Sequence, residues 1–368
     1  MQIICEGLDL GAATLKVTKA IASKTTNPIL EGIKLTAQDG KLILSATDLE
    51  IGIEKTIKAQ VKQEGETVVP GKFFSEFIKK LSNEQIKLTV NEKNNLLINY
   101  TDSESSLQCF NPLEFPTLNK IEDGEYFKIS QNNFKNLINK SVFAVAVDDS
   151  RPILKGVLLE IGDGFVKAVA LDGYRMAVVK KPISKTTAKT SIIVPSRSLN
   201  EISKILDDSD DEIEVYIQKN FLMVDLKDTK ITTRLIDGDF MNYSQLIPKD
   251  FATSITINKL QLEDALDRTS VLSRIDRNNL VMFNIKEKVL VLTSNSEIGT
   301  VKENLSISLK GNDLAIAFNA RYFTESLRAI GEEFIKISFN MQSSPCVITP
   351  PQGEEYLYLV LPVRMINQ

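Results

Sequence analysis

The fold is decided by residues 27–32, which read Asn27-Pro28-Ile29-Leu30-Glu31-Gly32 and return 124 residues later as Arg151-Pro152-Ile153-Leu154-Lys155-Gly156. The same offset carries residues 45–48 (Ser-Ala-Thr-Asp) onto residues 169–172 (Val-Ala-Leu-Asp). An offset of 125 carries Val68-Val69-Pro70 onto Ile193-Val194-Pro195. A fixed period of this length indicates one structural unit that is built more than once along the chain.

A third, more diverged copy completes the 368 residues. Residues 292–295 (Leu-Thr-Ser-Asn) follow the second copy's equivalent by 123 positions, and Ala317-Phe318-Asn319 follows by 124. The joins between copies are polar and fall near residues 119–124 and 248–254. We therefore expect three domains, at residues 1–120, 125–248 and 250–368.

Each copy predicts the same order of elements, which is clearest in the second. Phe134, Leu137 and Ile138 have helical spacing, and the alternating segments 156–160 and 165–169 read as two strands joined by a glycine turn. A second helix is expected after Pro70, Pro195 and Asn319, and further strands close each copy. The predicted fold class is α+β, with two helices packed on antiparallel sheet in each of three tandem units.

Composition excludes several classes of function. The chain has no histidine, which removes every histidine nucleophile, general base and metal site. Its three cysteines are far apart, which fits a reducing cytoplasm and no disulfide framework. No apolar run could span a membrane, the N-terminus lacks a secretory signal, and no nucleotide-binding loop is present. We expect no catalytic residue, no metal and no cofactor.

The second helices carry a repeated pair of cations in a chain whose formal net charge is −4. One position of the pair holds Lys72, Arg197 and Arg321. The other, seven residues later, holds Lys79, Lys204 and Arg328. Seven helical residues return to nearly the same direction, so each pair forms one stripe. A single stripe would indicate only a solvated face, but three copies predict a surface that meets phosphate without reading bases.

The carboxylates of Asp48 and Asp172 favour a rival interpretation. As a pair they could support acid–base chemistry, and the rival hypothesis is a cytoplasmic carboxylate-dependent hydrolase. They occupy equivalent positions in separate copies, however, and Asn295 replaces them in the third copy. An aspartate repeated at a strand end is typical of a turn or cap residue, which is the interpretation we prefer.

Two segments occur in one copy only. Residues 171–177 read Leu-Asp-Gly-Tyr-Arg-Met-Ala, and residues 356–365 read Tyr-Leu-Tyr-Leu-Val-Leu-Pro-Val-Arg-Met. Each alone could be a core strand. A feature that is absent from the other copies is nevertheless where a specialised function would be expected.

With residues 151–159, 233–238 (Thr-Arg-Leu-Ile-Asp-Gly) and 361–364 (Leu-Pro-Val-Arg), these segments make the chain resemble the bacterial sliding clamps, the beta subunits of DNA polymerase III. The resemblance covers the whole chain. It implies three DNA-clamp domains and a head-to-tail homodimeric ring around double-stranded DNA. It also implies a non-enzymatic, cytoplasmic and nucleoid-associated processivity factor. The implied partners are the polymerase alpha subunit, the clamp loader, and other polymerases and repair proteins, with no membrane partner.

The resemblance also implies site residues. A pocket for short peptide motifs would be formed by Leu154, Leu171, Gly173, Tyr174, Arg175, Met176, Leu246, Asn319, Tyr322, Pro345, Val360, Leu361, Pro362, Val363, Arg364 and Met365. The subunit contact would use Leu107, Val271 and Leu272, and Lys24 would join the DNA-facing residues. Four positions depart from the pattern of many relatives and leave the peptide preference open: Tyr174, Met241, Gln245 and Arg277.

Overall fold

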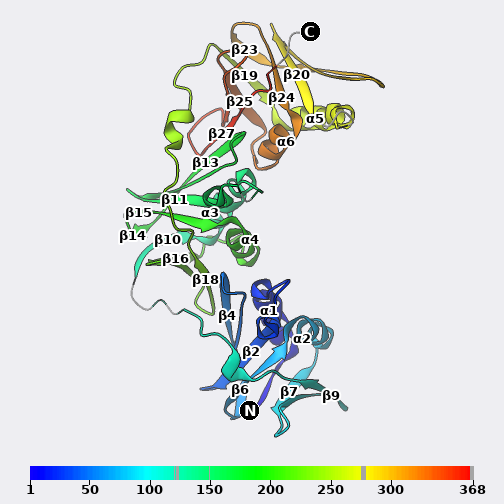
Figure 1. The fold of residues 1–368 in the computed structure, drawn as a ribbon, viewed down its shortest axis with the longest axis vertical. Coiled ribbons are helices and arrows are strands. Elements are labelled where there is room, and N and C mark those ends of the chain that lie inside the picture. Colours follow the sequence, from blue (N-terminus) through cyan, green and yellow to red (C-terminus); the bar gives the residue numbers. More distant parts are fainter. Residues whose placement is uncertain (120, 122–123, 149, 275–278, 365–368) are drawn as a thin grey trace. The chain divides into compact units, whose positions relative to one another are not determined.

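The computed structural model describes residues 1–119, 121, 124–148, 150–274 and 279–364 (Figure 1). Each copy of the repeat contributes two helices, as predicted. They are α1 (Gly7–Val17), α2 (Gly71–Ile78), α3 (Gln131–Asn139), α4 (Ser196–Ile205), α5 (Lys259–Ser273) and α6 (Ala320–Arg328). The second helices begin directly after Pro70, Pro195 and Asn319, which confirms the predicted starts. None of the described helices is long and apolar enough to cross a membrane.

The segments that revealed the repeat have the same structure in both copies. Residues Pro28–Glu31 and Pro152–Lys155 each form a short 3-10 helix that opens on proline and leads directly into a strand. A proline fits this position because its fixed φ suits the first helical residue and its missing N–H is not needed there. The repeated segment is thus a short helical turn that leads the chain into the first strand after it.

The chain divides into two compact units. The first comprises residues 1–131, 184–188 and 201–235, and it holds two antiparallel sheets. The five-stranded sheet runs in the order β5 (Gln60–Gln63), β1 (Gln2–Glu6), β7 (Gln85–Val90), β8 (Asn95–Tyr100) and β9 (Ser103–Gln108). The nine-stranded sheet runs in the order β14 (Lys185–Thr186), β10 (Glu125–Ser130), β16 (Glu212–Gln218), β17 (Phe221–Asp225), β18 (Thr229–Arg234), β4 (Ile51–Lys58), β3 (Lys41–Thr47), β2 (Gly32–Gln38) and β6 (Gly65–Pro70).

The second unit comprises residues 132–183, 189–200 and 236–368. Its nine-stranded antiparallel sheet runs in the order β15 (Thr190–Pro195), β11 (Gly156–Gly162), β12 (Phe165–Leu171), β13 (Arg175–Pro182), β27 (Tyr356–Val360), β26 (Cys346–Thr349), β25 (Phe334–Phe339), β19 (Thr253–Asn258) and β23 (Ser308–Gly311). Its four-stranded sheet runs in the order β22 (Gly299–Ser306), β21 (Val289–Ser296), β20 (Leu280–Lys286) and β24 (Leu314–Asn319). The predicted antiparallel fold class is confirmed.

Each nine-stranded sheet crosses a join between copies of the repeat. In the first unit β4 pairs with β18, and in the second β13 pairs with β27. We use the word seam for these two strand pairings. An unpaired strand edge is an aggregation hazard, and each seam removes two such edges by pairing them with each other.

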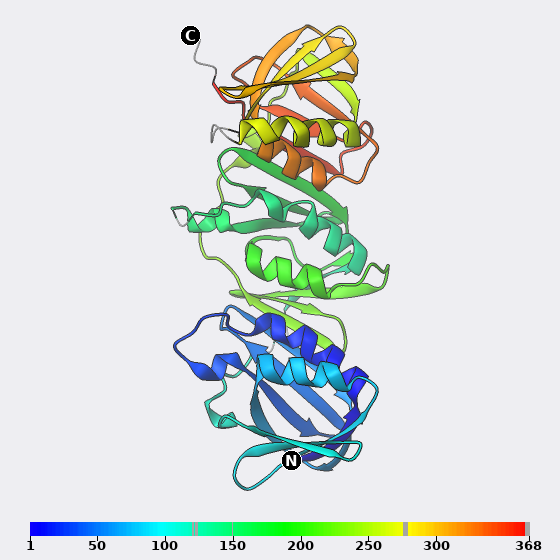
Figure 2. The ribbon, with the colours of Figure 1, turned by 90° about the vertical axis from the view of Figure 1, so that its right-hand side faces the viewer.

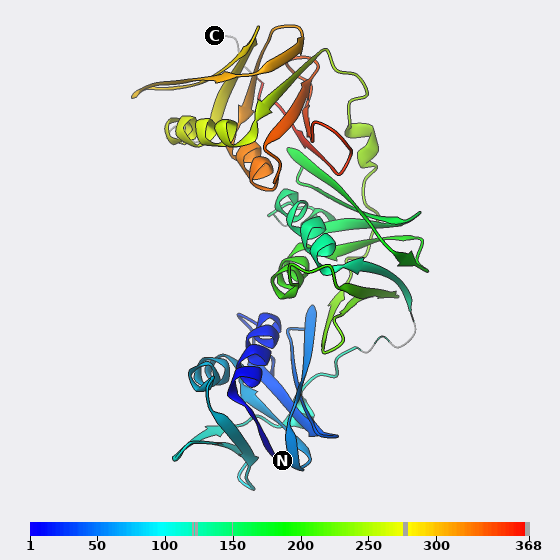
Figure 3. The same ribbon diagram turned by 180° about the vertical axis from the view of Figure 1, so that it is seen from behind.

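Helices cover these sheets in pairs. In the first unit α1 and α2 lie against each other, and in the second α5 and α6 do so (Figures 2 and 3). The helices bury one apolar side, for example Phe74 and Ile78 of α2 and Phe323 and Leu327 of α6. Burying each such side chain stabilises the folded state by ~1.5–3 kcal/mol.

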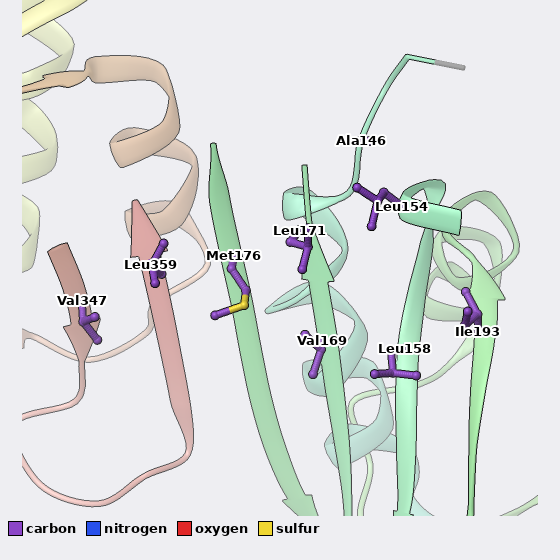
Figure 4. Close-up of a cluster of buried hydrophobic side chains, with 9 residues drawn as sticks. All are labelled: Ala146, Leu154, Leu158, Val169, Leu171, Met176, Ile193, Val347 and Leu359. Carbon is purple, nitrogen blue, oxygen red and sulfur yellow. The ribbon is translucent and has the colours of Figure 1, made fainter. Parts of the chain in front are cut away.

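A buried apolar cluster lies beside the seam of the second unit (Figure 4). It is built by β11, β12 and β13 from one side and by β26 and β27 from the other. Its members are Ala146, Leu154, Leu158, Val169, Leu171, Met176, Ile193, Val347 and Leu359. Because residues from both copies share this cluster, the seam is held by side-chain packing as well as by strand pairing.

Candidate binding pocket and charged helix faces

A cavity of about 480 Å³ opens at the seam of the second unit. It is lined by Arg151, Leu171, Gly173, Tyr174, Arg175, Met176, Met241, Gln245, Leu246, Pro345, Leu359 and Leu361. The turn between β12 and β13 supplies one wall, and β27 with the residue before β26 supplies another. The connection between β18 and β19 supplies a third wall through Met241, Gln245 and Leu246. A concave and mainly apolar site with a few polar groups is typical of ligand and peptide pockets.

The turn between β12 and β13 is shaped by Asp172. Its Oδ1 atom accepts hydrogen bonds from the backbone N–H groups of Tyr174 at 2.9 Å and Arg175 at 3.0 Å. Gly173, between them, has a φ of +92°, which a side chain would strain. The turn thereby holds Tyr174 outward, with 59% of its surface exposed.

Arg175 is almost completely buried, at 6% exposure, and all three guanidinium nitrogens have partners. Nε donates to Asp172 Oδ2 at 3.0 Å, Nη1 to the carboxylate of Glu325, and Nη2 to the carbonyl of Phe143 at 2.8 Å. The guanidinium carbon also lies 4.9 Å from the centre of the Tyr322 ring, on α6. A guanidinium fixed in this way is a rigid part of the pocket wall.

Glu325 of α6 serves two cations at once. It accepts from Arg175 and, at 2.7 Å, from Nε of Arg321 one helical turn away. Desolvation raises the pKa of Glu325, but the hydrogen bonds from Arg321 and Arg175 outweigh it and hold the pKa below its usual value of 4.5. The carboxylate is therefore ionised at neutral pH and neutralises charge behind the pocket.

Aromatic and apolar side chains complete the pocket. The rings of Tyr174 and Tyr322 stack with centroids 5.6 Å apart. Leu171, Met176 and Leu359 are buried and form the floor, as part of the cluster described above. The rim is more exposed and carries Met241, Leu246 and Leu361.

The connection between β18 and β19 is anchored beside the pocket. Tyr243, in the 3-10 turn Tyr243–Leu246, donates its hydroxyl to Glu160 Oε2 at 2.7 Å and accepts from Lys167 Nζ at 3.1 Å. Glu160 and Lys167 belong to paired positions of β11 and β12. This anchor positions Gln245 and Leu246 at the rim of the cavity.

The structure brings half of the sixteen sequence-predicted pocket residues together around the cavity. Eight line the cavity: Leu171, Gly173, Tyr174, Arg175, Met176, Leu246, Pro345 and Leu361. Tyr322 lies behind Tyr174, Leu154 belongs to the buried cluster, and Asn319 caps α6 through its side chain. Val360 pairs with Arg175 across the seam, and the N–H of Val363 donates to the carbonyl of Ala317. Pro362 and Arg364 follow β27 outside the cavity lining, while Met365 and Arg277 lie outside the described residues.

Four lining residues were missing from the predicted site: Arg151, Met241, Gln245 and Leu359. Arg151 begins the repeated segment, Leu359 lies within the distinctive C-terminal segment, and Met241 and Gln245 were noted only as departures. Strand alternation would have found Leu359, because it lies two residues before Leu361 and so on the same face of the sheet.

All of the predicted DNA-facing cations are exposed, but several have acidic neighbours. Lys24 lies in the loop before the 3-10 turn Pro28–Glu31, Lys72 on α2, and Arg197 on α4. Lys79 is in a 3-10 turn just beyond α2, so its stripe is not purely α-helical. Ion pairs join Lys204 to Glu201, Arg321 to Glu325, and Arg328 to both Glu263 and Asp267.

The predicted subunit-contact residues differ in exposure. Leu107 is on the edge strand β9, and Val271 of α5 is 65% exposed. Leu272, its neighbour, is 8% exposed and faces the core of its own unit. Only Val271 of this helical pair thus presents a large free apolar surface.

Asp48 and Asp172 have the structural role that the turn interpretation predicted. Asp48 Oδ1 accepts from the N–H groups of Glu50 at 3.0 Å and Ile51 at 2.9 Å, just as Asp172 does in the second copy. Each carboxylate is engaged within its own turn. The hydrolase hypothesis loses its proposed acid–base pair.

Three tandem copies of a two-helix antiparallel unit, with exposed cations on the second helices and a peptide-sized pocket at one seam, define the DNA sliding clamps as a class. Family models of the DNA polymerase III beta subunit match the N-terminal domain at residues 1–119, the central domain at 128–242 and the C-terminal domain at 244–364. The chain belongs to this family, the bacterial beta sliding clamps, which are processivity factors and not enzymes.

Comparison with individual proteins gives the same assignment. The beta sliding clamps of Staphylococcus epidermidis and Staphylococcus aureus are 33% and 32% identical over 356 residues, covering 94% of this chain and of each relative. The sliding clamp structure from Bacillus subtilis is 32% identical, covers 100% of both chains and has a TM-score of 0.96. The beta subunit structure from Streptococcus pyogenes is 28% identical, covers 99% of this chain and 100% of its own, and has a TM-score of 0.95.

Proposed function

We propose that this chain forms a head-to-tail homodimeric ring that encircles duplex DNA without sequence preference and tethers the replicative polymerase to it. The observation that carries the proposal is the pocket at the second seam, in a chain that belongs to the beta sliding clamp family. A closed ring is retained because it must open to leave. Weak contacts with DNA therefore suffice, and they permit sliding.

The pocket is proposed to bind short linear motifs with Gln and Leu or Phe anchors. Its floor of Leu171, Met176 and Leu359 suits an aliphatic or aromatic anchor, and the Gln245 amide at the rim suits a polar one. The proposed carriers of such motifs are the polymerase III alpha subunit, the clamp loader, and other polymerases and repair proteins. Tyr174, Met241 and Gln245 would set the ranking of motifs in this chain.

The exposed cations of α2, α4 and α6, together with Lys24, are proposed to face DNA phosphates. Acidic partners reduce the effective charge of Lys204, Arg321 and Arg328. Binding that depends on a small number of cations is weak and falls steeply with salt. It carries no base readout, which suits a protein that moves along DNA.

The subunit contact is proposed to join the first copy of one chain to the third copy of another. β9 and β22 are both edge strands, so each offers unpaired backbone groups to a partner strand. Leu107 belongs to β9, and α5, which carries Val271, packs against β22. On α2, the exposed Phe73 stacks on Phe77 at 6.1 Å and adds apolar surface to the first copy.

We further propose domain boundaries at residues 1–120, 125–248 and 250–368, and a cytoplasmic, nucleoid-associated location. The family matches end within a few residues of these limits, except at the second join, where the central match ends at residue 242. No catalytic, metal or cofactor role is assigned to any residue.

Retention on circular DNA tests the proposed function. The protein is loaded by a clamp loader onto nicked circular duplex DNA, and the amount retained is compared before and after linearisation. We expect retention on the circle and loss from the linear form, and equal retention on both would contradict a topological link. Charge reversal at Lys72, Arg197 and Arg321 should impair loading, whereas reversal at the exposed lysines Lys93, Lys219 and Lys310, which lie off the helices, should not.

A further inference from the structure

The first seam contains a counterpart of the pocket at the second seam. A cavity of about 70 Å³ in the first unit is lined by residues of the turn between β3 and β4 and by Phe221 and Thr232. Residues 116–119, in the connection between β9 and β10, complete the lining. The registers of the two strand pairings allow a comparison residue by residue, because Ile51 pairs with Thr233 just as Arg175 pairs with Val360.

Seven lining residues of the two cavities correspond under this registration. In the first seam they are Thr47, Leu49, Glu50, Ile51, Gly52, Phe221 and Thr232. In the second seam, in the same order, they are Leu171, Gly173, Tyr174, Arg175, Met176, Pro345 and Leu359. The two recesses are therefore the same architectural feature at successive seams.

Backbone geometry is repeated as well. Leu49 has a φ of +77° where Gly173 has +92°. The N–H of Arg234 donates to the carbonyl of Glu50 at 2.9 Å, as the N–H of Leu361 donates to the carbonyl of Tyr174 at 2.8 Å. A non-glycine residue in the left-handed region is uncommon and costs conformational energy. The first seam keeps this turn shape although its sequence is less suited to it.

The difference lies in what occupies the recess. In the first unit the chain's own Leu118 lies over Gly52, with its Cδ2 only 2.9 Å from where a Cβ of residue 52 would stand. Leu118, Asn119, Gly52 and Thr232 line both the 70 Å³ cavity and a neighbouring one of about 200 Å³. Leu118 thus divides a larger recess in two.

The second seam stays open for a visible reason. Its connecting segment is drawn to the pair Glu160 and Lys167 by Tyr243. The corresponding positions of the first copy are Thr36 and Ile43, which offer no such ion pair. At the recess of the first unit, Leu118 of the connection lies over Gly52 instead.

We infer that Leu118 is an internal anchor that fills, in cis, the seat that a partner's leucine takes at the second seam, and that removing it exposes a second peptide-binding seat on each chain. The inference rests on the proposed peptide-binding function of the second seam. The seat would take an extended peptide with one leucine-sized anchor. Glu54 and Lys230 lie beside this seat, where the second seam has Val178 and Leu357. The peptide would therefore need polar residues next to its leucine anchor.

The first test counts peptide sites. A fluorescently labelled Gln-Leu-Ser-Leu-Phe peptide is titrated into wild type, Leu118→Ala and the matched control Leu113→Ala, whose side chain is exposed in the same connection. We expect one site per chain in wild type and in Leu113→Ala. Leu118→Ala should show a second site at least tenfold weaker, because Ile51 replaces Arg175 there. A single site, or none, in correctly folded Leu118→Ala overturns the inference.

A peptide-independent measurement separates this inference from the proposed function. Gly52→Ala should lower the thermal midpoint in wild type, because the new methyl group meets Leu118. In the Leu118→Ala background the same change should leave the midpoint unchanged or raise it, since alanine is better than glycine in a strand. An equal drop in both backgrounds would show that Leu118 does not occupy this seat, whatever the second seam binds.

Discussion

The guanidinium group of Arg175 donates to the carboxylate of Glu325 across 150 residues of sequence. Arg175 starts β13 in the second copy of the repeat, and Glu325 is on α6 in the third. The ion pair therefore joins two copies directly behind the pocket. Because the same carboxylate also holds Arg321, the pocket wall and the exposed face of α6 share one anion.

Replacing this anion should weaken the fold. Glu325→Gln leaves the buried Arg175 with Asp172 as its one acidic partner among the ion pairs described here. We expect a loss of about 1–3 kcal/mol in the free energy of unfolding, measured by urea denaturation. The matched change Glu303→Gln removes the partner of Arg268, an exposed cation, and should cost less. Equal losses in both variants would contradict a special role for Glu325.

The stability difference between wild type and Glu325→Gln should depend on pH in a defined direction. The pKa of Glu325 is held below 4.5 in the folded chain, so the unfolded state binds the proton more readily. The stabilisation is complete above about pH 5 and is lost as pH falls through the lowered pKa. Thermal midpoints of the two proteins should converge as the pH falls below about 4.5 and through the lowered pKa of Glu325. A gap that widens on acidification would reverse the assigned sign.

Tyr174 should contribute to peptide binding through its ring. It is largely exposed and stacks on Tyr322, so its ring is available to a ligand without repacking the core. Tyr174→Ala should weaken binding of a Gln-Leu-Ser-Leu-Phe peptide roughly tenfold, and Tyr174→Phe should change it less than twofold. Fluorescence anisotropy measures both. A tenfold loss in the phenylalanine variant would instead assign the contribution to the hydroxyl.

Val271 offers a test of the subunit contact that spares the fold. Its side chain is 65% exposed, so Val271→Arg should leave the thermal midpoint of the isolated chain unchanged. A charge buried in an apolar contact should raise the Kd of the dimer at least a hundredfold. Light scattering across a dilution series gives the mass. An undisturbed dimer would remove Val271 from the contact, and Lys310→Glu serves as an exposed control.

The three thiols should be unreactive until the chain opens. Cys5, Cys109 and Cys346 are buried, and burial raises the pKa of the Cys5 thiol to about 12 and the pKa values of the other two above their usual value. Since the thiolate is the reactive form, we expect negligible labelling by a disulfide reagent at pH 8 and three equivalents in denaturant. Rapid labelling of one native thiol would indicate local opening near it.

Much of the fold could be predicted from the sequence. The 124-residue offset gave three copies, and Pro70, Pro195 and Asn319 gave the starts of the second helices. What escaped prediction was the joining of sheets across the copies, through β4 with β18 and β13 with β27. Strand alternation reports which face is buried, but it contains no information about which distant strand lies alongside.

The candidate site was predicted in part, for a related reason. The turn of Asp172 and Gly173 is local, so its residues were found from a short segment. Leu359 enters the cavity only because strands from two copies meet, and Leu272 was not expected to be buried. Lys204, Arg321 and Arg328 carry acidic partners that neither helical spacing nor formal charge predicts.

The strand pairings at the seams also decide how the chain can be cut. A fragment ending at the first polar join would lose β18 and leave β4 as a bare edge of an apolar sheet. A fragment ending at the second join would expose β13 in the same way. Cuts that follow the sequence repeat therefore produce fragments that are prone to aggregate through the exposed strand edge. A fragment that starts at residue 1 and keeps both strands of the first seam must extend to Arg234, and it then contains β13 without β27. No single cut between residues 58 and 356 therefore leaves both seams whole.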